Sequence, residues 1–403
     1  MEQQQDITSD PQVIQLRQDI RSILHRRLRE AVEIVLEEEL SAALGSGWYE
    51  RSDGRRGYRN GSEQRQVTTS AGSQTLRVPR GRLAAPAGSE REFRSEILPR
   101  YARRTKEVDD AILSVYLAGG NTRRMRKALQ PLLGSEHLSK SAVSRVVTRL
   151  KAHFTAWKER DLSEERYAVL FLDGFHLKVR LARRVVSVPV LAALGVAPDG
   201  TKVLVGLELA VSESSGHWAQ LIDDLRRRGL SAPVLLVTDG HAGLRKAVNA
   251  WPGVKIQRCA QHKQENLLQA APVHARREVR RDYRRIIDAR DGLSARRAYT
   301  AFIAKWSTLC PAVVRSLEEA GEQLLTFFEF PKGMWRALRT TNSLENLNRE
   351  FRRRTKTQAS FCSEEAAVTL LYGLVAFGQI QLRKIDGHHH VAALLGERQE
   401  AAA

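Results

Sequence analysis

The stretch YAVLFLDGFHLKV, residues 167–179, has the apolar pattern of a β-strand, and an aspartate interrupts it at position 173. Further strand-like and helical patterns follow it: strands at Val185–Val196 and Lys202–Ala210, a helix at His217–Arg228, a strand at Pro233–Val237, a short helix around 242–250 and a strand at Val254–Arg258. Three strands in series, and then an alternation of helix and strand, predict a mixed α/β sheet that is antiparallel first and parallel afterwards.

The predicted order of elements is that of a ribonuclease-H-like fold. After residue 262 the pattern is helical for the rest of the chain. A chain of 403 residues is too long for one ordinary core, and its apolar fraction of 42% is enough to bury several. We therefore expect a multi-domain α+β protein.

The charge of the chain indicates a polyanionic partner. Lysine and arginine total 65 against 46 acidic residues, a net charge of +19 that repels itself in an isolated globule. Nucleic acid is the first candidate, and an anionic membrane surface is the second. No apolar run approaches the ~18 residues of a spanning helix, and the first residues, MEQQQDITSD, lack the features of a signal peptide. Three widely separated cysteines favour a reducing cytoplasm over a disulfide framework: Cys259, Cys310 and Cys362.

The first 104 residues predict a long helix and a basic, β-rich arm. Apolar residues recur at helical spacing from Pro11 to Gly45, which is a suitable helix end. Residues 51–104 contain thirteen arginines against five acids, hence +8, and we expect two short strands at Arg65–Thr69 and Gln74–Val78. A flexible basic linker is the alternative interpretation of this stretch.

Three helical runs between residues 108 and 150 have the outline of a helix-turn-helix: Val108–Ala118, Thr122–Leu133 and Lys140–Leu150, the last capped by Ser139. In such a motif the last helix lies in the major groove, so Lys140 and Arg145 are candidate DNA contacts. A three-helix bundle that binds nothing has the same outline.

Two aspartates occupy positions suited to metal-dependent phosphodiester chemistry. That chemistry uses two hard cations held by two or three converging carboxylates. Asp173 interrupts an apolar strand, where an unpaired acid is costly to desolvate. Asp239 ends the run Val-Leu-Leu-Val-Thr, and ligand sites of open α/β sheets lie just beyond the carboxyl ends of strands. Ordinary Asp-Gly turns are the structural alternative for both residues.

A third carboxylate, Glu345, stands at the head of the helix predicted in TTNSLENLNREFRRRTK, residues 340–356. One structural interpretation is a capping box with Asn342 as the N-cap, and another is an ion pair with Arg349. The functional interpretation is a site where the carboxylate binds metal and its polar and basic neighbours hold phosphates. Those neighbours are Asn348, Arg352, Arg353 and Lys356.

A row of arginines at i,i+4 spacing predicts a track along phosphates further upstream: Arg276, Arg280 and Arg284. A second row lies beside it: Arg277, Arg281 and Arg285. The alternative is a solvated basic face, which we disfavour here on the expectation that no acids interleave with the arginines.

At these residues the sequence resembles the Mutator-type family of bacterial insertion-sequence transposases, and the likeness covers nearly the whole chain. Each motif alone is weak, but together and in register they are specific. They are YRNGSEQRQVTTSAGSQTLRVPR at 58–80, LDGFHLKVR at 172–180, LGVAPDGTKVLVG at 194–206, ESSGHWAQLIDDLRRRGL at 213–230, VTDGHAGL at 237–244, QRCAQHKQEN at 257–266 and RTTNSLENLNREFRRRTK at 339–356.

The resemblance implies a DDE transposase whose ribonuclease-H-like catalytic core is interrupted by an all-helical insertion. By motif position the triad falls on Asp173, Asp239 and Glu345, which would hold two Mg²⁺ ions, with Mn²⁺ as a substitute. The family also marks Cys259 and His262. We interpret this pair as structural scaffolding near the metal site, because the sequence offers no convincing second half of a zinc site.

The expected domains follow from the same resemblance and from the patterns above. They are an N-terminal amphipathic helix (1–45), a basic β-rich arm (46–104), a helix-turn-helix-like DNA-binding region (105–160), the catalytic core (161–262 and 339–380), the helical insertion (263–338) and a C-terminal tail (381–403). The first three would recognise the terminal inverted repeats of the element.

The predicted function is cleavage of a DNA strand to leave a 3′-hydroxyl, followed by attack of that hydroxyl on double-stranded target DNA. Joining two ends at once requires a homodimer or a larger assembly. We expect no membrane partner and a cytoplasmic, nucleoid-associated location. Two alternatives stay open: a structure-selective nuclease on the same fold, and a non-enzymatic DNA-binding protein descended from a transposase.

Overall fold

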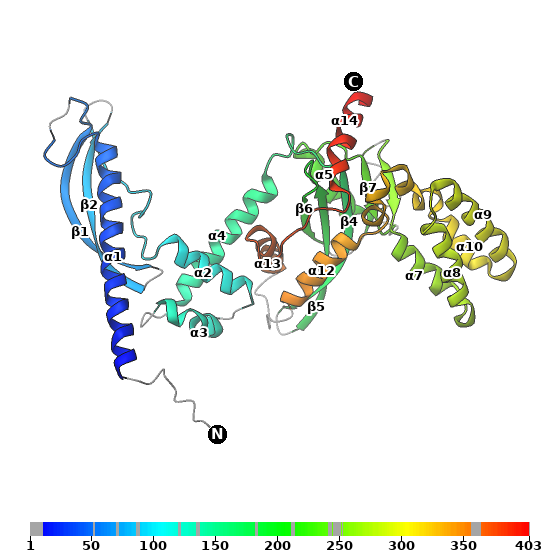
Figure 1. The fold of residues 1–403 in the computed structure, drawn as a ribbon, viewed down its shortest axis with the longest axis horizontal. Coiled ribbons are helices and arrows are strands. Elements are labelled where there is room, and N and C mark those ends of the chain that lie inside the picture. Colours follow the sequence, from blue (N-terminus) through cyan, green and yellow to red (C-terminus); the bar gives the residue numbers. More distant parts are fainter. Residues whose placement is uncertain are drawn as a thin grey trace. The chain divides into compact units, whose positions relative to one another are not determined.

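The computed structural model describes residues 11–50, 53–69, 72–85, 89–119, 122–133, 138–181, 184–210, 214–240, 244, 251, 253–355 and 364–402 (Figure 1). The chain divides into two units, Met1–Thr148 and Arg149–Ala403. Each unit has its own buried apolar core.

The first unit begins with a long helix packed on a small antiparallel sheet. The elements are α1 (Pro11–Leu44), β1 (Gly57–Thr69), β2 (Gly72–Ala84) and β3 (Glu90–Glu92), with strand order β1-β2-β3. Alternate residues of β2 point inward, and Leu76 and Val78 pack with Leu36 of α1. The predicted helix is thus confirmed. The linker interpretation of residues 51–104 is wrong, because its two strands pair along their length into a hairpin longer than predicted.

Three helices follow the sheet: α2 (Lys106–Leu117), α3 (Thr122–Leu133) and α4 (Lys140–Glu159). Ser139 caps α4, because its Oγ accepts a hydrogen bond of 3.1 Å from the backbone N–H of Ala142. The three predicted helices are confirmed, and α4 is longer than predicted. Lys140 and Arg145 are exposed on its first turns.

The second unit is built on a five-stranded mixed sheet with strand order β6-β5-β4-β7-β8. The strands are β4 (Val169–Leu181), β5 (Arg184–Val196), β6 (Lys202–Leu209), β7 (Leu235–Thr238) and β8 (Lys255–Arg258). The first three pair antiparallel, whereas β7 is parallel to β4 and β8 is parallel to β7. The prediction of a sheet that is antiparallel first and parallel afterwards is confirmed.

Helices cover both faces of this sheet. On one face, α5 (Ser215–Arg227) buries Trp218 and Leu221 against side chains that include Leu172 of β4. On the other face lies α12 (Asn342–Thr355) (Figure 1). Its Phe351 stacks on Phe175 of β4, with ring centroids 5.8 Å apart. Because side chains alternate along a strand, Asp173 shares the α12 face with Phe175.

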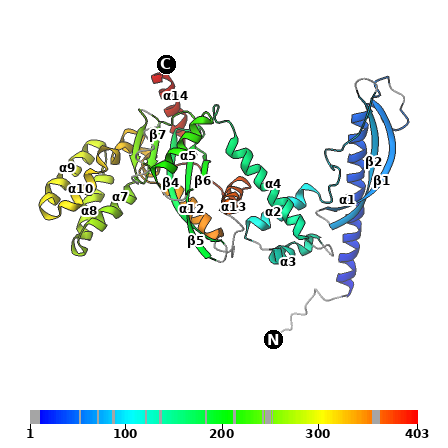
Figure 2. The ribbon, with the colours of Figure 1, turned by 180° about the vertical axis from the view of Figure 1, so that it is seen from behind.

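A group of helices leaves the sheet after β8 and returns before α12 (Figures 1 and 2). Its helices are α7 (Ala260–Ala270), α8 (Arg276–Ile287), α9 (Gly292–Leu309), α10 (Pro311–Glu318) and α11 (Trp335–Leu338). They enclose a core of their own, which includes Tyr283, Phe302 and Trp306. The helical texture predicted after residue 262 is confirmed.

The turns between α10 and α11 cover β8, which is an edge strand of the sheet. The buried side chain of Gln257 donates to the carbonyl of Leu324 at 3.0 Å and accepts from the N–H of Phe327 at 2.7 Å. Thr326 donates through its hydroxyl to the carbonyl of Ile256 at 2.8 Å. The helical group is therefore joined to the sheet by buried hydrogen bonds as well as by the chain.

Two helices complete the second unit, α13 (Glu364–Ala376) and α14 (Val391–Ala402). Among the helices in the described ranges, none combines the length and the apolar character needed to span a membrane.

Candidate functional site

Asp173 lies in the middle of β4 and is only 5% exposed. Its neighbour across the sheet face is Asn348 of α12, whose Nδ2 donates a hydrogen bond of 3.1 Å to Asp173 Oδ2. Asn348 is itself 3% exposed. The aspartate is therefore a buried acid held in orientation by a neutral amide, as expected for a carboxylate that is not simply a solvated turn residue.

Asp239 follows β7 directly, and β7 lies beside β4. The last parallel pair of these strands is Leu172 with Thr238, so Asp173 and Asp239 are the next residues of their chains. Neighbouring strands are separated by about 4.8 Å, which brings the two aspartates to the same part of the sheet. Gly240, with φ +81°, then turns the chain away.

Glu345 lies in the first turn of α12, on the segment that follows the helical group α7 to α11. The helix begins at Asn342, so Thr341 precedes it and the predicted capping box with Asn342 as the N-cap is wrong. The hydroxyl of Thr341 instead donates a hydrogen bond of 3.0 Å to Glu345 Oε1. Only 29% of the Glu345 side chain is exposed.

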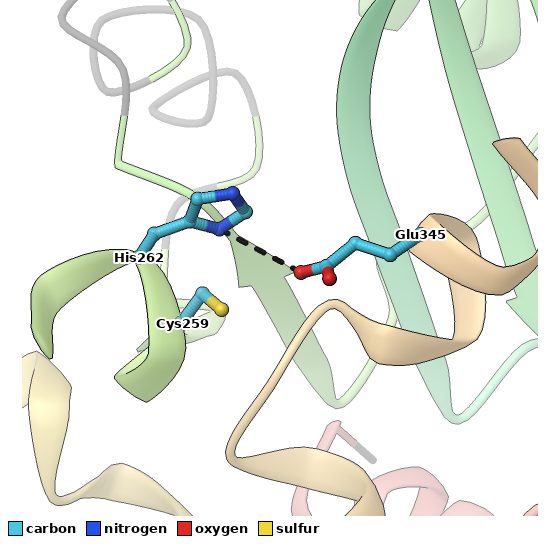
Figure 3. Close-up of side chains that lie close together, drawn as sticks. All are labelled: Cys259, His262 and Glu345. Atoms are coloured by element: carbon cyan, nitrogen blue, oxygen red, sulfur yellow. Dashed lines mark ion pairs between the residues drawn. The ribbon is translucent and has the colours of Figure 1, made fainter. Parts of the chain in front are cut away.

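Glu345 meets the Cys-x-x-His pair at the end of β8, as Figure 3 shows. Within the described ranges, one group of His, Cys, Asp or Glu side chains has three ligand atoms all within 4.8 Å of one another, and it consists of Cys259, His262 and Glu345. His262 Nδ1 and Glu345 Oε1 are 3.9 Å apart. The sequence predicted the pair as scaffolding without a partner and missed Glu345 as its third member.

The charges around His262 favour its positively charged form. A hydrogen bond to the Cys259 sulfur, and the charges of Cys259, Asp173 and Glu345, raise the pKa of His262 to about 9, although burial opposes the shift. The imidazole therefore senses both Asp173 and Glu345, which come from separate segments of the chain. The side chains of Asp173 and Asp239 do not join the three-residue group within 4.8 Å.

A buried ionic cluster lies against Gly240, the residue after Asp239, and no sequence pattern predicted it. Arg258, 2% exposed, donates two hydrogen bonds of 3.1 Å to the two carboxylate oxygens of Glu319 on the insertion. Lys263, equally buried, donates to Glu319 Oε2 at 2.5 Å and to the carbonyl of Ser316 at 2.7 Å. Glu319 lies 61 residues from Arg258, so sequence spacing does not pair them.

The candidate phosphate contacts on α12 divide into buried and exposed residues. Arg352 and Arg353 are exposed, and Arg353 pairs with Glu350 at 2.8 Å. Asn348, which the sequence predicted as a DNA contact, is instead buried and donates a hydrogen bond to Asp173. Its position suits a residue that orients that carboxylate. Lys356 lies outside the described residues.

The arginine rows of the insertion lie on α8, where Arg276, Arg280 and Arg284 are exposed. The expectation that no acids interleave is wrong. Glu278 and Asp282 stand between the arginines, and Arg281 contacts them at 3.2 Å and 3.6 Å. The second row is thus partly neutralised within its own helix, whereas in the described part of the chain the ion pairs of these two acids do not include Arg276, Arg280 or Arg284.

Comparisons with known proteins agree on one family. The family described as "Transposase, Mutator family" matches residues 1–380. The transposase for insertion sequence element IS406 of Burkholderia multivorans is 37% identical over 357 residues, covering 86% of this chain and 89% of that protein. The transposase for insertion sequence element IS1081 of Mycobacterium tuberculosis is 33% identical over 389 residues, covering 96% and 92%. The chain therefore belongs to the Mutator family of transposases.

Proposed function

We propose that this protein is the transposase of an insertion sequence, which binds terminal inverted repeats, cuts a DNA strand and joins the 3′-hydroxyl end to target DNA. The observation that carries this proposal is the convergence at the sheet. Asp173 and Asp239 each follow a member of the last residue pair, Leu172 and Thr238, on two adjacent strands. The charges of Glu345 and Asp173 both raise the pKa of His262. The triad is thus assigned to these three acids.

The donor set suits Mg²⁺, or Mn²⁺ in its place, because carboxylate oxygens are the ligands that hard cations prefer. Asp173, Asp239 and Glu345 would hold two such ions. When bound, the ions neutralise charge at the attacking and leaving oxygens of the phosphodiester and make a bound water more acidic.

The neighbouring side chains prepare these carboxylates for that role. Asn348 fixes one oxygen of Asp173 through its amide, and the Thr341 hydroxyl fixes one oxygen of Glu345. Held carboxylates lose little orientational freedom when the DNA arrives, which lowers the cost of reaching the reactive geometry. Exposed Arg352 and Arg353 on the same helix are assigned to DNA phosphates.

The strand order supports a ribonuclease-H-like core formed by residues 161–262 and 339–380. Numbered by their order in the chain, the five strands lie across the sheet as third, second, first, fourth and fifth. The fourth and fifth strands are parallel to the first. Residues 263–338 form the helical insertion. We assign recognition of the terminal repeats to residues 1–160, and because two ends are joined together we propose a homodimer or larger assembly.

Strand cleavage and joining on a labelled duplex that carries the element's own terminal repeat tests this function. With Mg²⁺ or Mn²⁺ the wild type is expected to release 3′-hydroxyl ends and to join them to target DNA. Asp173→Ala, Asp239→Ala and Glu345→Ala are expected to bind the repeat and do neither. Asp223→Asn is the matched control, because this acid is 65% exposed on α5 and its loss leaves the site intact.

The outcomes separate the alternatives. Cleavage without preference for the repeat would favour a structure-selective nuclease. Binding of the repeat without any cleavage would favour a DNA-binding relic. Activity in any of the three alanine variants would remove that residue from the triad.

A further inference from the structure

We infer that Cys259, His262 and Glu345 form a binding site for one thiophilic divalent cation of the zinc type, separate from the magnesium ions of the proposed reaction. A thiolate, an imidazole and a carboxylate are each common zinc ligands, and three protein ligands with an open fourth position are typical of accessible zinc sites. The regulatory consequence drawn below rests on the proposed function, but the binding itself does not.

The distances are close to those that a bound ion requires. Tetrahedral zinc, with bonds of about 2.3 Å to sulfur and 2.0–2.1 Å to nitrogen, holds its ligand atoms about 3.3–3.7 Å apart. His262 Nδ1 and Glu345 Oε1 are 3.9 Å apart, and all three ligand atoms lie within 4.8 Å of one another (Figure 3). The His262 and Glu345 side chains are 33% and 29% exposed, so each has room for the small movement that coordination needs.

The backbone holds the ligands on two segments that are tied together. The N–H of Cys259 donates to the carbonyl of Thr238 at 2.7 Å, which fixes the cysteine to the end of β7. The next residue, Ala260, donates to the carbonyl of Arg339 at 2.8 Å, just before the helix that carries Glu345. The site is therefore built by the fold and does not depend on a mobile surface loop.

The sulfur is already surrounded by hydrogen-bond donors. Cys259 is fully buried, and its Sγ lies 3.4 Å from both the N–H and the hydroxyl of Thr341; the N–H donates toward it, and the single hydroxyl proton is directed either to it or to Glu345 Oε1. Metal ions bind cysteine as the thiolate and displace the thiol proton, and the N–H of Thr341 would remain a donor to the sulfur of a bound ion's ligand.

The Thr341 hydroxyl shows where such a cation would bind. Its oxygen lies 3.0 Å from Glu345 Oε1, 3.4 Å from Cys259 Sγ and 3.5 Å from His262 Nδ1. One hydroxyl carries one proton and satisfies one acceptor at a time. A cation at the point that these three atoms surround would coordinate all of them at once, after His262 releases the proton of Nδ1.

Occupation of this site would compete with the proposed reaction. The same carboxylate of Glu345 serves both assignments, so an ion held together with Cys259 and His262 would occupy a ligand that the proposed reaction requires. Zinc at this position is therefore expected to inhibit strand cleavage at concentrations far below those of Mg²⁺, because soft and borderline ligands favour zinc strongly over magnesium.

Titration of the full-length, reduced protein with Co²⁺ tests the binding, since Co²⁺ substitutes for zinc and reports its ligands by absorption. The wild type is expected to show a sulfur-to-cobalt charge-transfer band with one equivalent of Co²⁺, and Zn²⁺ is expected to bleach it. Glu345→Gln and His262→Gln are expected to weaken Co²⁺ binding by at least about tenfold, because each removes a ligand. Cys259→Ser is expected to abolish the band.

Two controls exclude cobalt bound at other cysteines or histidines. The Cys310→Ser/Cys362→Ser variant keeps Cys259 as its one cysteine and is expected to retain the band. Any cobalt bound by the run His388–His390 would be held through nitrogen and would produce no sulfur band. A wild type without a sulfur band, or a band that survives both Glu345→Gln and His262→Gln, would overturn the inference even if Cys259→Ser fails to fold.

The activity measurement separates this inference from the proposed function. Asp239→Asn is expected to lose strand cleavage and to keep the cobalt band. If the wild type never cuts DNA but shows the band, the proposed function fails and the cation site stands. If the wild type cuts DNA and zinc saturates the band without inhibiting cleavage, the competition for Glu345 is wrong.

Discussion

The guanidinium of Arg258 lies directly against Gly240, the residue that follows Asp239. A Cβ added to Gly240 would overlap the Nε, Cζ and Nη2 atoms of Arg258. The glycine also has φ +81°, a conformation that other residues adopt at a cost. A buried arginine, clamped by Glu319 of the insertion, thus packs against the turn that carries a proposed catalytic aspartate.

Gly240→Ala is expected to destabilise the protein and to reduce strand cleavage more than it reduces DNA binding. The left-handed backbone costs about 1 kcal/mol for alanine, and displacement of Arg258 adds to it, for a total of at least about 2 kcal/mol. Gly253→Ala is the matched control, because Gly253 has φ +76° with nothing within 4 Å of an added Cβ. Equal shifts of the urea midpoint in the two variants would show that the contact with Arg258 is unimportant.

Glu319→Gln is expected to remove a pH-dependent part of the stability. Burial opposes ionisation of Glu319, but hydrogen bonds from Arg258 and Lys263 outweigh it and lower its pKa to about 2. Because this folded-state pKa lies below the ordinary glutamate pKa of about 4.3, the stabilisation is complete above that value. It is lost as the pH falls from there toward 2.

Urea unfolding between pH 7 and pH 3 measures this effect. At pH 7 the variant is expected to lose about 2 kcal/mol, less than for a fully buried ion pair because one third of the Glu319 side chain is exposed. The difference from wild type should narrow as the pH approaches 3. Glu322→Gln is the control, because Glu322 is 73% exposed and its partner Arg296 is 57% exposed, and it should change stability by less than about 0.5 kcal/mol. A loss at Glu322 as large as that at Glu319 would contradict the prediction.

Asn348→Ala is expected to lower the rate of strand cleavage about 10- to 100-fold with little change in affinity for DNA. The amide holds Asp173 Oδ2 at 3.1 Å, and positioning groups around metal ligands act through metal affinity and orientation. Cleavage rates at varied Mg²⁺ concentration and binding by gel shift give the two quantities separately. A loss of DNA affinity that matches the loss of rate would restore Asn348 to the DNA contacts predicted from the sequence.

Arg280→Ala/Arg284→Ala is expected to weaken DNA binding with little sequence preference and to reduce the salt dependence of the binding constant by about 2 units of slope. Both side chains are exposed on α8. Arg281→Ala is the control, because Arg281 already contacts Glu278 and Asp282 and should contribute less. Equal effects at Arg281 would indicate a general basic face instead of a phosphate track.

Local patterns predicted most of the elements because their causes are local. The alternation of apolar residues around Asp173 and the run before Asp239 follow from burial of neighbouring side chains, and the structure has strands at both. The cap of α4 at Ser139 is likewise set by residues three positions apart.

The features that the sequence did not predict depend on residues far apart in the chain. Glu345 reaches Cys259 only because the insertion returns beside its starting point, and Arg258 is buried only because Glu319 arrives from the insertion. Spacing within a helix gave a wrong prediction at α12, because the helix begins one residue earlier than a cap at Asn342 requires. Such placements are set by the packing of separate segments.

The hydrogen bonds of Gln257 with Leu324 and Phe327, and of Thr326 with Ile256, cover the outer edge of β8 and bear on self-association. An edge strand exposes unpaired backbone groups that are a template for another chain, and many proteins protect such edges. Here the insertion covers the edge with its own side-chain and main-chain groups. A shortened protein without the insertion would therefore expose the unpaired edge of β8 to other copies and aggregate. The helical group thus keeps the sheet soluble by covering this edge.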